Sequence, residues 1–320
     1  MFIKGIVFRI ESKDIYILPD NSDEVIRASL RGKFKKDFHL KKDKQYITDI
    51  VVVGDRVGFE LNKDGTGIIE KIDKRKNYLS RKAPRLKGAS YRGERLEQII
   101  ASNIDKLIIV ASVYDPSFNN KTIDRFLVAA ESSSIKPVIV INKIDLDDDN
   151  RIKDFASLYS DIGYSTILTS CINMQNIEEV KNLLEGNVSI LWGQSGVGKS
   201  SLLNLIYPGL NLETGEVSVS TSKGKHTTVT VSMHKINEDT FIVDTPGIRE
   251  IDPYGIKKED LSHYFIDFLP FINNCKYNTC THNHEPLCAV EEAVINGFIS
   301  EERYDSYLRL LDTIEDDILF

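Results

Sequence analysis

Long hydrophobic runs are absent from this chain of 320 residues, and cysteine, methionine and tryptophan are scarce. No segment approaches the roughly 20 apolar residues that a membrane-spanning helix needs. The N-terminal segment MFIKGIVFRIESKD becomes charged too early for a secretory signal peptide, and no internal repeat is visible. We therefore expect a soluble, cytoplasmic, monomeric protein, and the length favours two or three domains.

Positive charge is scarce after the first third of the chain. Residues 1–95 hold 23 Lys and Arg against 14 Asp and Glu, whereas residues 96–320 hold 18 against 34. This asymmetry predicts that the N-terminal third meets a polyanion, although a solvated charged surface would give the same counts. Residues 73–95 are especially basic, with Tyr78 and Tyr91 interleaved. They show no helical or strand period, so we expect a linker or loop there.

Short strands separated by turn residues dominate residues 1–72, which predicts a small β-barrel. An OB-fold is the favoured kind, and an SH3-like barrel would look similar in sequence. The expected strands are Gly5–Ile10, Ile15–Leu18, Val25–Leu30, Ile50–Glu60 and Gly67–Ile72.

Buried strands alternate with amphipathic helices across residues 96–253, which predicts a mostly parallel α/β domain. Residues 254–320 look helical around a group of Cys and His residues. We thus expect a barrel, a basic connector, an α/β domain and a helical module. The expected strands of the α/β domain are Lys106–Ser112, Pro137–Ile141, Ser165–Leu168, Val188–Trp192 and Thr240–Val243, with helices over Ile123–Glu131 and Ile177–Leu184.

A complete phosphate-binding loop, GQSGVGKS, occupies residues 193–200 between an expected strand and an expected helix. Its glycines allow backbone N–H groups to point at phosphates in front of a helix N-terminus. Lys199 is expected to reach the β- and γ-phosphates and to act in catalysis, and Ser200 to ligate Mg²⁺. The predicted phosphate contacts are Gly193, Gln194, Ser195, Gly196, Val197, Gly198, Lys199, Ser200 and Ser201.

The segment Asn142-Lys143-Ile144-Asp145 follows a predicted strand and fits the guanine-binding motif N-K-x-D. Its Asp carboxylate would accept hydrogen bonds from guanine N1–H and the exocyclic amine, a donor pair that adenine does not offer. Thr169-Ser170-Cys171 follows the next predicted strand, where backbone contacts to the base are expected. The sequence therefore predicts GTP rather than ATP.

Asp244-Thr245-Pro246-Gly247 fits the motif D-x-x-G, in which the Asp holds a Mg²⁺-bound water and the Gly senses the γ-phosphate. A threonine between the two phosphate motifs would complete the Mg²⁺ shell, and Thr227 and Thr228 are both candidates. Segments that order on the γ-phosphate and relax on hydrolysis behave as switches.

A glutamine that orients water is missing after the D-x-x-G glycine, where this chain has Ile248. A butyl side chain can neither orient nor deprotonate water. We expect His226, beside the switch threonines, to supply this function; a polar loop residue without a catalytic role is the competing interpretation.

Three of the four cysteines lie within 14 residues, at Cys275, Cys280 and Cys288, with His282 and His284 among them. In a cytosolic chain such a group predicts a metal site rather than disulfides. Three thiolates and one imidazole form a closed set typical of structural Zn²⁺.

The motifs run in a rotated order, since N-K-x-D precedes the phosphate loop. This order, the barrel in front and the Cys/His group behind resemble the YjeQ/RsgA-type circularly permuted GTPases. The G-K-H-T-T segment at Gly224 and the hydrophobic Ile248 also match. The resemblance assigns the metal ligands as Cys275, Cys280, His282 and Cys288.

The resemblance implies a bacterial GTPase that binds 16S rRNA and the 30S ribosomal subunit late in assembly and is stimulated by that subunit. Two alternatives remain open. One is a GTP sensor with negligible hydrolysis, consistent with Ile248. The other is a GTPase that serves an RNA-modifying or translation-elongation partner.

Overall fold

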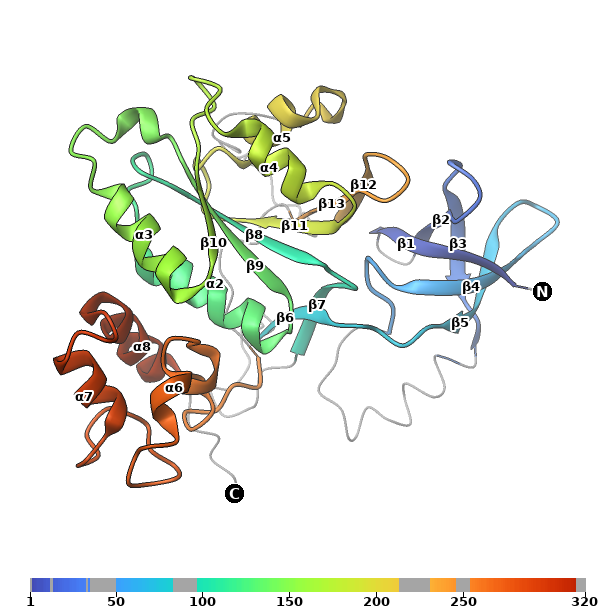
Figure 1. Cartoon of the computed structure of the whole chain (residues 1–320). Coiled ribbons are helices and arrows are strands. Elements are labelled where there is room, and N and C mark those ends of the chain that lie inside the picture. Colours follow the sequence, from blue (N-terminus) through green and yellow to red (C-terminus); the bar gives the residue numbers. More distant parts are fainter. Residues whose placement is uncertain are drawn as a thin grey trace, which may run out of the picture.

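The computed structural model describes residues 2–11, 14–32, 34, 50–82, 97–212, 231–245 and 254–314. Figure 1 shows an N-terminal β-barrel, a central sheet covered by helices on both faces, and a C-terminal helical module beside α2 and α3. None of the helices in the described ranges has the length and apolar character needed to cross a bilayer.

The N-terminal barrel closes in the strand order β1-β2-β3-β5-β4, with β4 pairing back onto β1. Strands β3 and β5 are parallel, and the other barrel pairs are antiparallel. This closed five-stranded order is that of an OB-fold, which confirms the favoured prediction. The strands are β1 (Ile3–Glu11), β2 (Asp14–Pro19), β3 (Ile26–Leu30), β4 (Arg56–Leu61) and β5 (Gly67–Ile72).

The expected strand Ile50–Glu60 is wrong in its first half, because β4 begins only at Arg56. The valines before it are buried but do not form a strand, since Gly54 turns the chain with φ +93°. A Cβ added at Gly54 would lie 2.1 Å from the carbonyl oxygen of Ser102, so the turn requires glycine.

The basic connector is also not the simple loop that we expected. Strand β6 (Tyr78–Lys82) pairs antiparallel with β7 (Glu97–Ser102), and Leu79 is buried. Arg75 binds the buried carboxylate of Asp55 through two hydrogen bonds of 2.7 and 2.8 Å. Ser102 donates a third bond to Asp55 at 2.7 Å. Arg75 therefore fastens the barrel to the next domain rather than facing a polyanion.

The central sheet has the order β10-β9-β8-β11-β13-β12, and only β12 runs antiparallel within it. Its strands match the predicted apolar runs closely, except β12, which the sequence analysis did not predict. Strand β12 also pairs with β1 of the barrel at Ser232 and Arg9. The strands are β8 (Lys106–Ser112), β9 (Lys136–Asn142), β10 (Ser165–Leu168), β11 (Val188–Trp192), β12 (Ser232–Lys235) and β13 (Phe241–Asp244).

Helices α2 and α3 cover one face of this sheet, and α4 and α5 cover the other (Figure 1). Asn119 caps α2 by accepting hydrogen bonds from the backbone N–H groups of Lys121 and Thr122. Gly163 ends α3 in the left-handed conformation. The helices are α2 (Asn120–Ser132), α3 (Ile152–Ile162), α4 (Ile177–Leu184) and α5 (Lys199–Ile206).

The C-terminal module packs on α2 around Phe265, Phe268 and Tyr307. Arg303 is 1% exposed and binds Asp124 of α2 at 2.6 Å and Asp267 of the module at 2.7 Å. This buried ion network joins the module to the α/β domain. The module contains a 3₁₀ turn (Leu261–Tyr264), α6 (Leu269–Ile272), α7 (Ala289–Ile295) and α8 (Glu301–Thr313).

Candidate functional site

The carboxyl ends of four parallel strands bring the described motif residues to one edge of the sheet. Strand β9 ends at Asn142, β10 leads to Thr169, β11 leads to Gly193, and β13 ends at Asp244. Strands β9 and β10 are added on one side of β8, and β11 and β13 on the other, so the strand order switches direction between β8 and β11. Helices α2 and α3 accordingly lie on one face of the sheet, and α4 and α5 on the other. Ligands of open α/β sheets bind at such a switch point.

The loop between β11 and α5 has the backbone of a phosphate cradle. Gly196 and Gly198 have φ values of +85° and +98°, which side-chain-bearing residues rarely adopt. A Cβ at Gly193 would lie 2.1 Å from the carbonyl oxygen of Val110. Helix α5 begins at Lys199 directly after this loop, so its free N–H groups face the loop.

Asn142 joins the predicted base-recognition segment to the phosphate loop. Its side-chain amide donates a hydrogen bond of 2.9 Å to the carbonyl oxygen of Val197. Its side-chain oxygen accepts one of 3.2 Å from the hydroxyl of Thr169. Asn142 is 1% exposed, so these bonds are shielded from water. The two motifs therefore share one rigid junction although 55 residues separate them.

Asp145 and Ser170 contact each other beside this junction. The Ser170 hydroxyl donates a hydrogen bond to a carboxylate oxygen of Asp145, and the backbone N–H of Asn173 donates to Ser170 at 3.1 Å. The backbone N–H of Ile144 donates to the carbonyl of Thr169 at 3.2 Å. The segments after β9 and β10 are thus held side by side, as a shared base contact requires.

Lys199 lies inside the phosphate loop and not out in solvent. Its ammonium donates bonds of 2.8 Å to the carbonyl oxygens of Gly193 and Gln194. Burial lowers the pKa of Lys199, while the charge of Asp244 opposes that shift. A partly buried ammonium at this position is suited to bind an anionic ligand, which would offset the cost of its burial.

The loop after β8 contains a contact that the sequence analysis missed. The Lys143 ammonium donates a hydrogen bond to the carbonyl oxygen of Asp115, and the Ser112 hydroxyl donates to the carbonyl of Pro116 at 2.7 Å. Because backbone carbonyls accept these bonds, no residue type in the sequence could have indicated them.

Several predicted site residues lie outside the described residues, namely His226, Thr227, Thr228, Gly247 and Ile248. The structure does describe the two strands next to these residues. Strand β12 begins at Ser232 and pairs with β13, which ends at Asp244. The remaining predicted phosphate-loop residues, Ser195, Ser200 and Ser201, lie on the loop and the first turn of α5.

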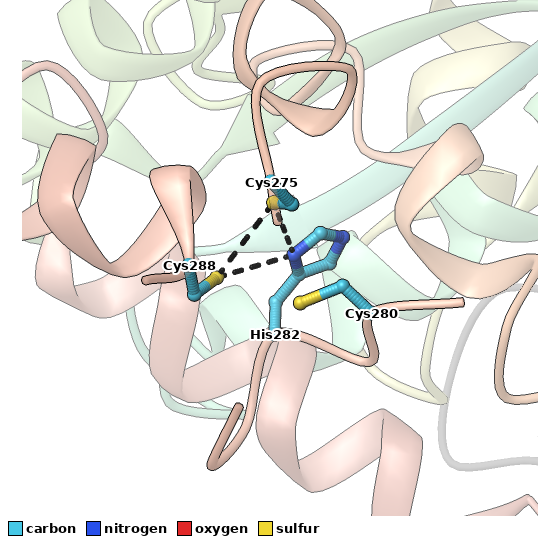
Figure 2. A group of neighbouring side chains, drawn as sticks. All are labelled: Cys275, Cys280, His282 and Cys288. Carbon is cyan, nitrogen blue, oxygen red and sulfur yellow. Dashed lines mark hydrogen bonds between the residues drawn. The ribbon is translucent and has the colours of Figure 1, made fainter. Parts of the chain in front are cut away.

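A second site lies in the C-terminal module, where Cys275, Cys280, His282 and Cys288 face one another (Figure 2). Their potential ligand atoms all lie within 4.8 Å of one another. Nδ1 of His282 lies 3.5 Å from the sulfur of Cys275 and 3.3 Å from that of Cys288, and these two sulfurs are 4.0 Å apart. A tetrahedral Zn²⁺ with ligand bonds of about 2.0–2.3 Å needs ligand separations of roughly 3.5–3.8 Å.

The chemistry of this group also suits a cation. Burial raises the pKa of the Cys280 and Cys288 thiols, and a bound cation would reverse that shift by stabilising the thiolates. Burial lowers the pKa of His282 and so favours the neutral imidazole that ligates metals. The group can therefore hold a metal ion, and His284, the other candidate histidine, is exposed outside it.

Carboxylate hydrogen bonds fix the loop that carries His282. Glu285 accepts bonds of 2.6 and 2.8 Å from the side chain and backbone of Thr281, and one of 3.1 Å from the backbone of Asn283. Partial burial opposes ionisation of Glu285, but these bonds outweigh it and hold its pKa well below the usual range. Tyr304 donates a 2.7 Å bond to the carbonyl of His282.

Comparisons with known proteins identify the family of this chain. The family model described as RsgA GTPase matches residues 72–254. The small ribosomal subunit biogenesis GTPase RsgA 2 of Bacteroides thetaiotaomicron is 37% identical over 317 residues, which cover 98% of each chain. The small ribosomal subunit biogenesis GTPase RsgA of Chlorobaculum parvum is 40% identical over 273 residues, which cover 84% of this chain and 87% of that relative.

Two solved structures resemble the whole chain. The crystal structure of YjeQ from Thermotoga maritima has a TM-score of 0.75 at 34% identity and matches 98% of both chains. That of YloQ, a circularly permuted GTPase, has a TM-score of 0.71 at 29% identity and matches 98% of this chain and 94% of YloQ. The family model, the full-length relatives and the two structures agree, and this chain belongs to the RsgA family of circularly permuted GTPases.

Proposed function

We propose that this protein hydrolyses GTP to GDP and phosphate on the small ribosomal subunit and acts late in the maturation of that subunit. The observation that carries the proposal is the bond from Asn142 to Val197, which joins the guanine-reading segment to the phosphate loop. Family membership supports the activity, and the names of the relatives support the subunit as the setting.

Guanine recognition falls to Asp145, whose carboxylate accepts from N1–H and the exocyclic amine of the base. Ser170 orients that carboxylate through its hydroxyl. The stem of Lys143 lies along the base, held by its bond to the carbonyl of Asp115. An analogue without the donor pair would leave the Asp145 carboxylate unpaired, which is the source of specificity.

The triphosphate is bound by the loop from Gly193 to Gly198 and by the first turn of α5. Lys199 would exchange its two loop carbonyls for the β- and γ-phosphates. Ser200, Asp244 and one of Thr227 and Thr228 would hold the Mg²⁺ that accompanies GTP, which neutralises charge on the phosphates. Gly247 senses the γ-phosphate, and His226 positions the attacking water in place of the missing glutamine.

The metal of the C-terminal module is proposed to be one structural Zn²⁺ held by Cys275, Cys280, His282 and Cys288. Four ligands close the coordination shell, which leaves no position for a substrate. The ion would supply folding free energy to the module and thereby hold Arg303 against Asp124 and Asp267.

We divide the chain into a barrel (residues 1–72), a basic connector (73–95), a GTPase domain (96–253) and a zinc-binding helical module (254–320), and we propose that it acts as a monomer in the cytoplasm.

The barrel and the basic connector are proposed to contact 16S rRNA. The positive balance of residues 1–95 suits a phosphate backbone. Arg75 does not take part, because Asp55 binds it. Lys74 in contrast is exposed, and Lys71 is exposed and pairs with Asp73 at the surface.

Multiple-turnover GTP hydrolysis with purified 30S, 50S and 70S particles tests the proposal. We expect a large rise in kcat with 30S particles and little change with 50S particles. A rate that stays at the intrinsic level, on the order of 10⁻⁴ s⁻¹ as for an unassisted GTPase, would point to a sensor without useful hydrolysis. Equal stimulation by all particles would contradict small-subunit specificity.

A further inference from the structure

Two large apolar side chains stand exposed at the end of α7. Ile295 is 84% exposed and Phe298 is 73% exposed. The ring of Phe271, on α6, lies 6.1 Å from the ring of Phe298 between centroids, and helices α6 and α7 contact each other. We call Phe271, Ile295 and Phe298 the α7 patch. It stands beside a module core in which Phe268 and Tyr307 are fully buried.

The backbone presents this patch rigidly. Gly297 has φ +75° and closes the helix, and its backbone N–H donates to the carbonyl of Val294 at 3.0 Å. The backbone N–H of Phe298 donates to the carbonyl of Ala293 at 2.9 Å. This is a helix-capping arrangement in which an apolar side chain after the glycine usually packs back on the helix. Phe298 is instead turned outward, so the geometry keeps it available to a partner at little entropic cost.

Exposed carboxylates lie before and after the patch residues along the chain. Glu292 lies one helical turn before Ile295 on the same face of α7. Glu301 and Glu302 follow Phe298 in the first turn of α8. All three are exposed, and within the described residues none of them forms an ion pair. Among the basic side chains of the module, Arg303 is buried between carboxylates, Arg309 pairs with Asp305, and the ammonium of Lys276 lies over the ring of Tyr277.

This combination selects the chemistry of the partner. Exposed carboxylates repel a phosphate backbone, whereas they attract Lys and Arg side chains. The apolar centre needs an apolar counterpart, as at the core of protein–protein interfaces. We propose that the α7 patch docks on a basic, amphipathic protein segment of the small ribosomal subunit. The inference rests on the proposed function and adds a protein contact to the RNA contact of the barrel.

Neutralising the carboxylates beside the patch distinguishes a protein partner from an RNA partner, because the two predict opposite changes in affinity. In full-length protein loaded with a non-hydrolysable GTP analogue, we would measure the Kd for purified 30S particles. Replacing Ile295 and Phe298 together by Ser should weaken binding about tenfold, as expected when interface anchors are truncated. Replacing Glu292, Glu301 and Glu302 by Gln should weaken it several-fold at low salt and less at high salt. Tighter binding of the Gln variant would overturn the proposal and indicate that RNA faces the patch.

A matched variant and a cross-link make the test decisive. Leu287 is 74% exposed in the same module but outside the patch, so Leu287→Ser should keep the wild-type Kd. A photo-reactive phenylalanine analogue at position 298 should give a 30S cross-link that protease removes and ribonuclease does not. A ribonuclease-sensitive cross-link, or an unchanged Kd in the Ser variant, would overturn the inference. If wild-type protein itself does not bind 30S particles, the proposed function is wrong, and the inference that rests on it is wrong as well.

Discussion

The side-chain amide of Asn142 donates to the carbonyl oxygen of Val197 across 2.9 Å, at a point where both groups are buried. Gly198 makes this approach possible, because a Cβ there would lie 2.3 Å from Nδ2 of Asn142. One side chain thus fixes the distance between the N-K-x-D segment and the loop from Gly193 to Gly198. In the proposed function, the binding of both the base and the phosphates depends on this bond.

Removing this amide should damage the structure and the binding of nucleotide together. Asn142→Ala leaves the buried carbonyl of Val197 unpaired, which costs about 1–3 kcal/mol of unfolding free energy. We also expect GDP affinity to fall by about tenfold, a change that corresponds to ~1.4 kcal/mol. Thermal unfolding and titration with a fluorescent GDP analogue measure the two effects. Asp148→Ala, at an exposed position of the following loop, should alter neither.

Arg303 should be the most costly single truncation in the C-terminal module. Arg303→Met strands the carboxylates of Asp124 and Asp267, which costs about 3–5 kcal/mol for a buried pair. Lys121→Ala removes an exposed pair with Asp305 at the same interface and should cost about 1 kcal/mol or less. Urea unfolding compares the two variants. Similar losses would contradict a special role for the buried network.

Acidification should partly relieve the Arg303→Met defect. Burial already raises the pKa of Asp124 above its usual value, and loss of the cation raises that pKa further. The folded state then binds more protons than the unfolded state, so its stability increases as the pH falls from neutral toward the pKa of an unfolded Asp, about 3.9. The difference in unfolding free energy between Arg303→Met and wild type should therefore become smaller over that pH range. In the double variant Arg303→Met/Asp124→Asn, position 124 no longer titrates. The difference in unfolding free energy from wild type should then lose the part of its pH dependence that Asp124 causes.

Removal of the metal should unfold the C-terminal module without dissolving the central sheet. A strong zinc chelator, or Cys288→Ser, should raise hydrogen exchange across residues 261–313 far more than across residues 106–142. Cys171→Ser alters the cysteine outside the group and should leave module exchange and metal content unchanged. Full protection of the module after complete metal loss would refute the structural role.

The proposed catalytic role of His226 makes a kinetic prediction. His226→Ala should lower the 30S-stimulated kcat by about 10²-fold or more, the usual contribution of a positioned acid–base group, while GDP affinity stays the same. His234→Ala, on β12 and beyond the predicted switch threonines, is the matched control. An unaltered stimulated rate in His226→Ala would remove the residue from the mechanism.

Strands that are buried on both faces were predictable because each is a continuous apolar run. The predicted bounds of β8 and β11 are those of the structure, and so are those of the partly exposed edge strand β10. Strand β12 was missed because only Met233 of its residues is buried. Strand β6 was missed because the polar and basic side chains after Leu79 hide its alternation.

The candidate sites were predictable where residue type carries the chemistry. Three thiols and an imidazole within 14 residues indicate a metal site, and an N-K-x-D motif directly after a strand indicates guanine recognition. Contacts between distant segments were not predictable, because the Arg303–Asp124 pair spans 179 residues of sequence. The ion pair between Arg75 and Asp55 could not be predicted either, because nothing in the sequence distinguishes Arg75 from the other basic residues around it.

The central claim is that Asp145 reads guanine at a site completed by the phosphate loop. Equilibrium binding of GDP and of xanthosine diphosphate to wild type and to Asp145→Asn tests it most directly. Wild type should prefer GDP, and the variant should prefer the xanthosine nucleotide, because an amide can donate to the extra oxygen of that base. A variant that keeps the wild-type preference for GDP would contradict the account.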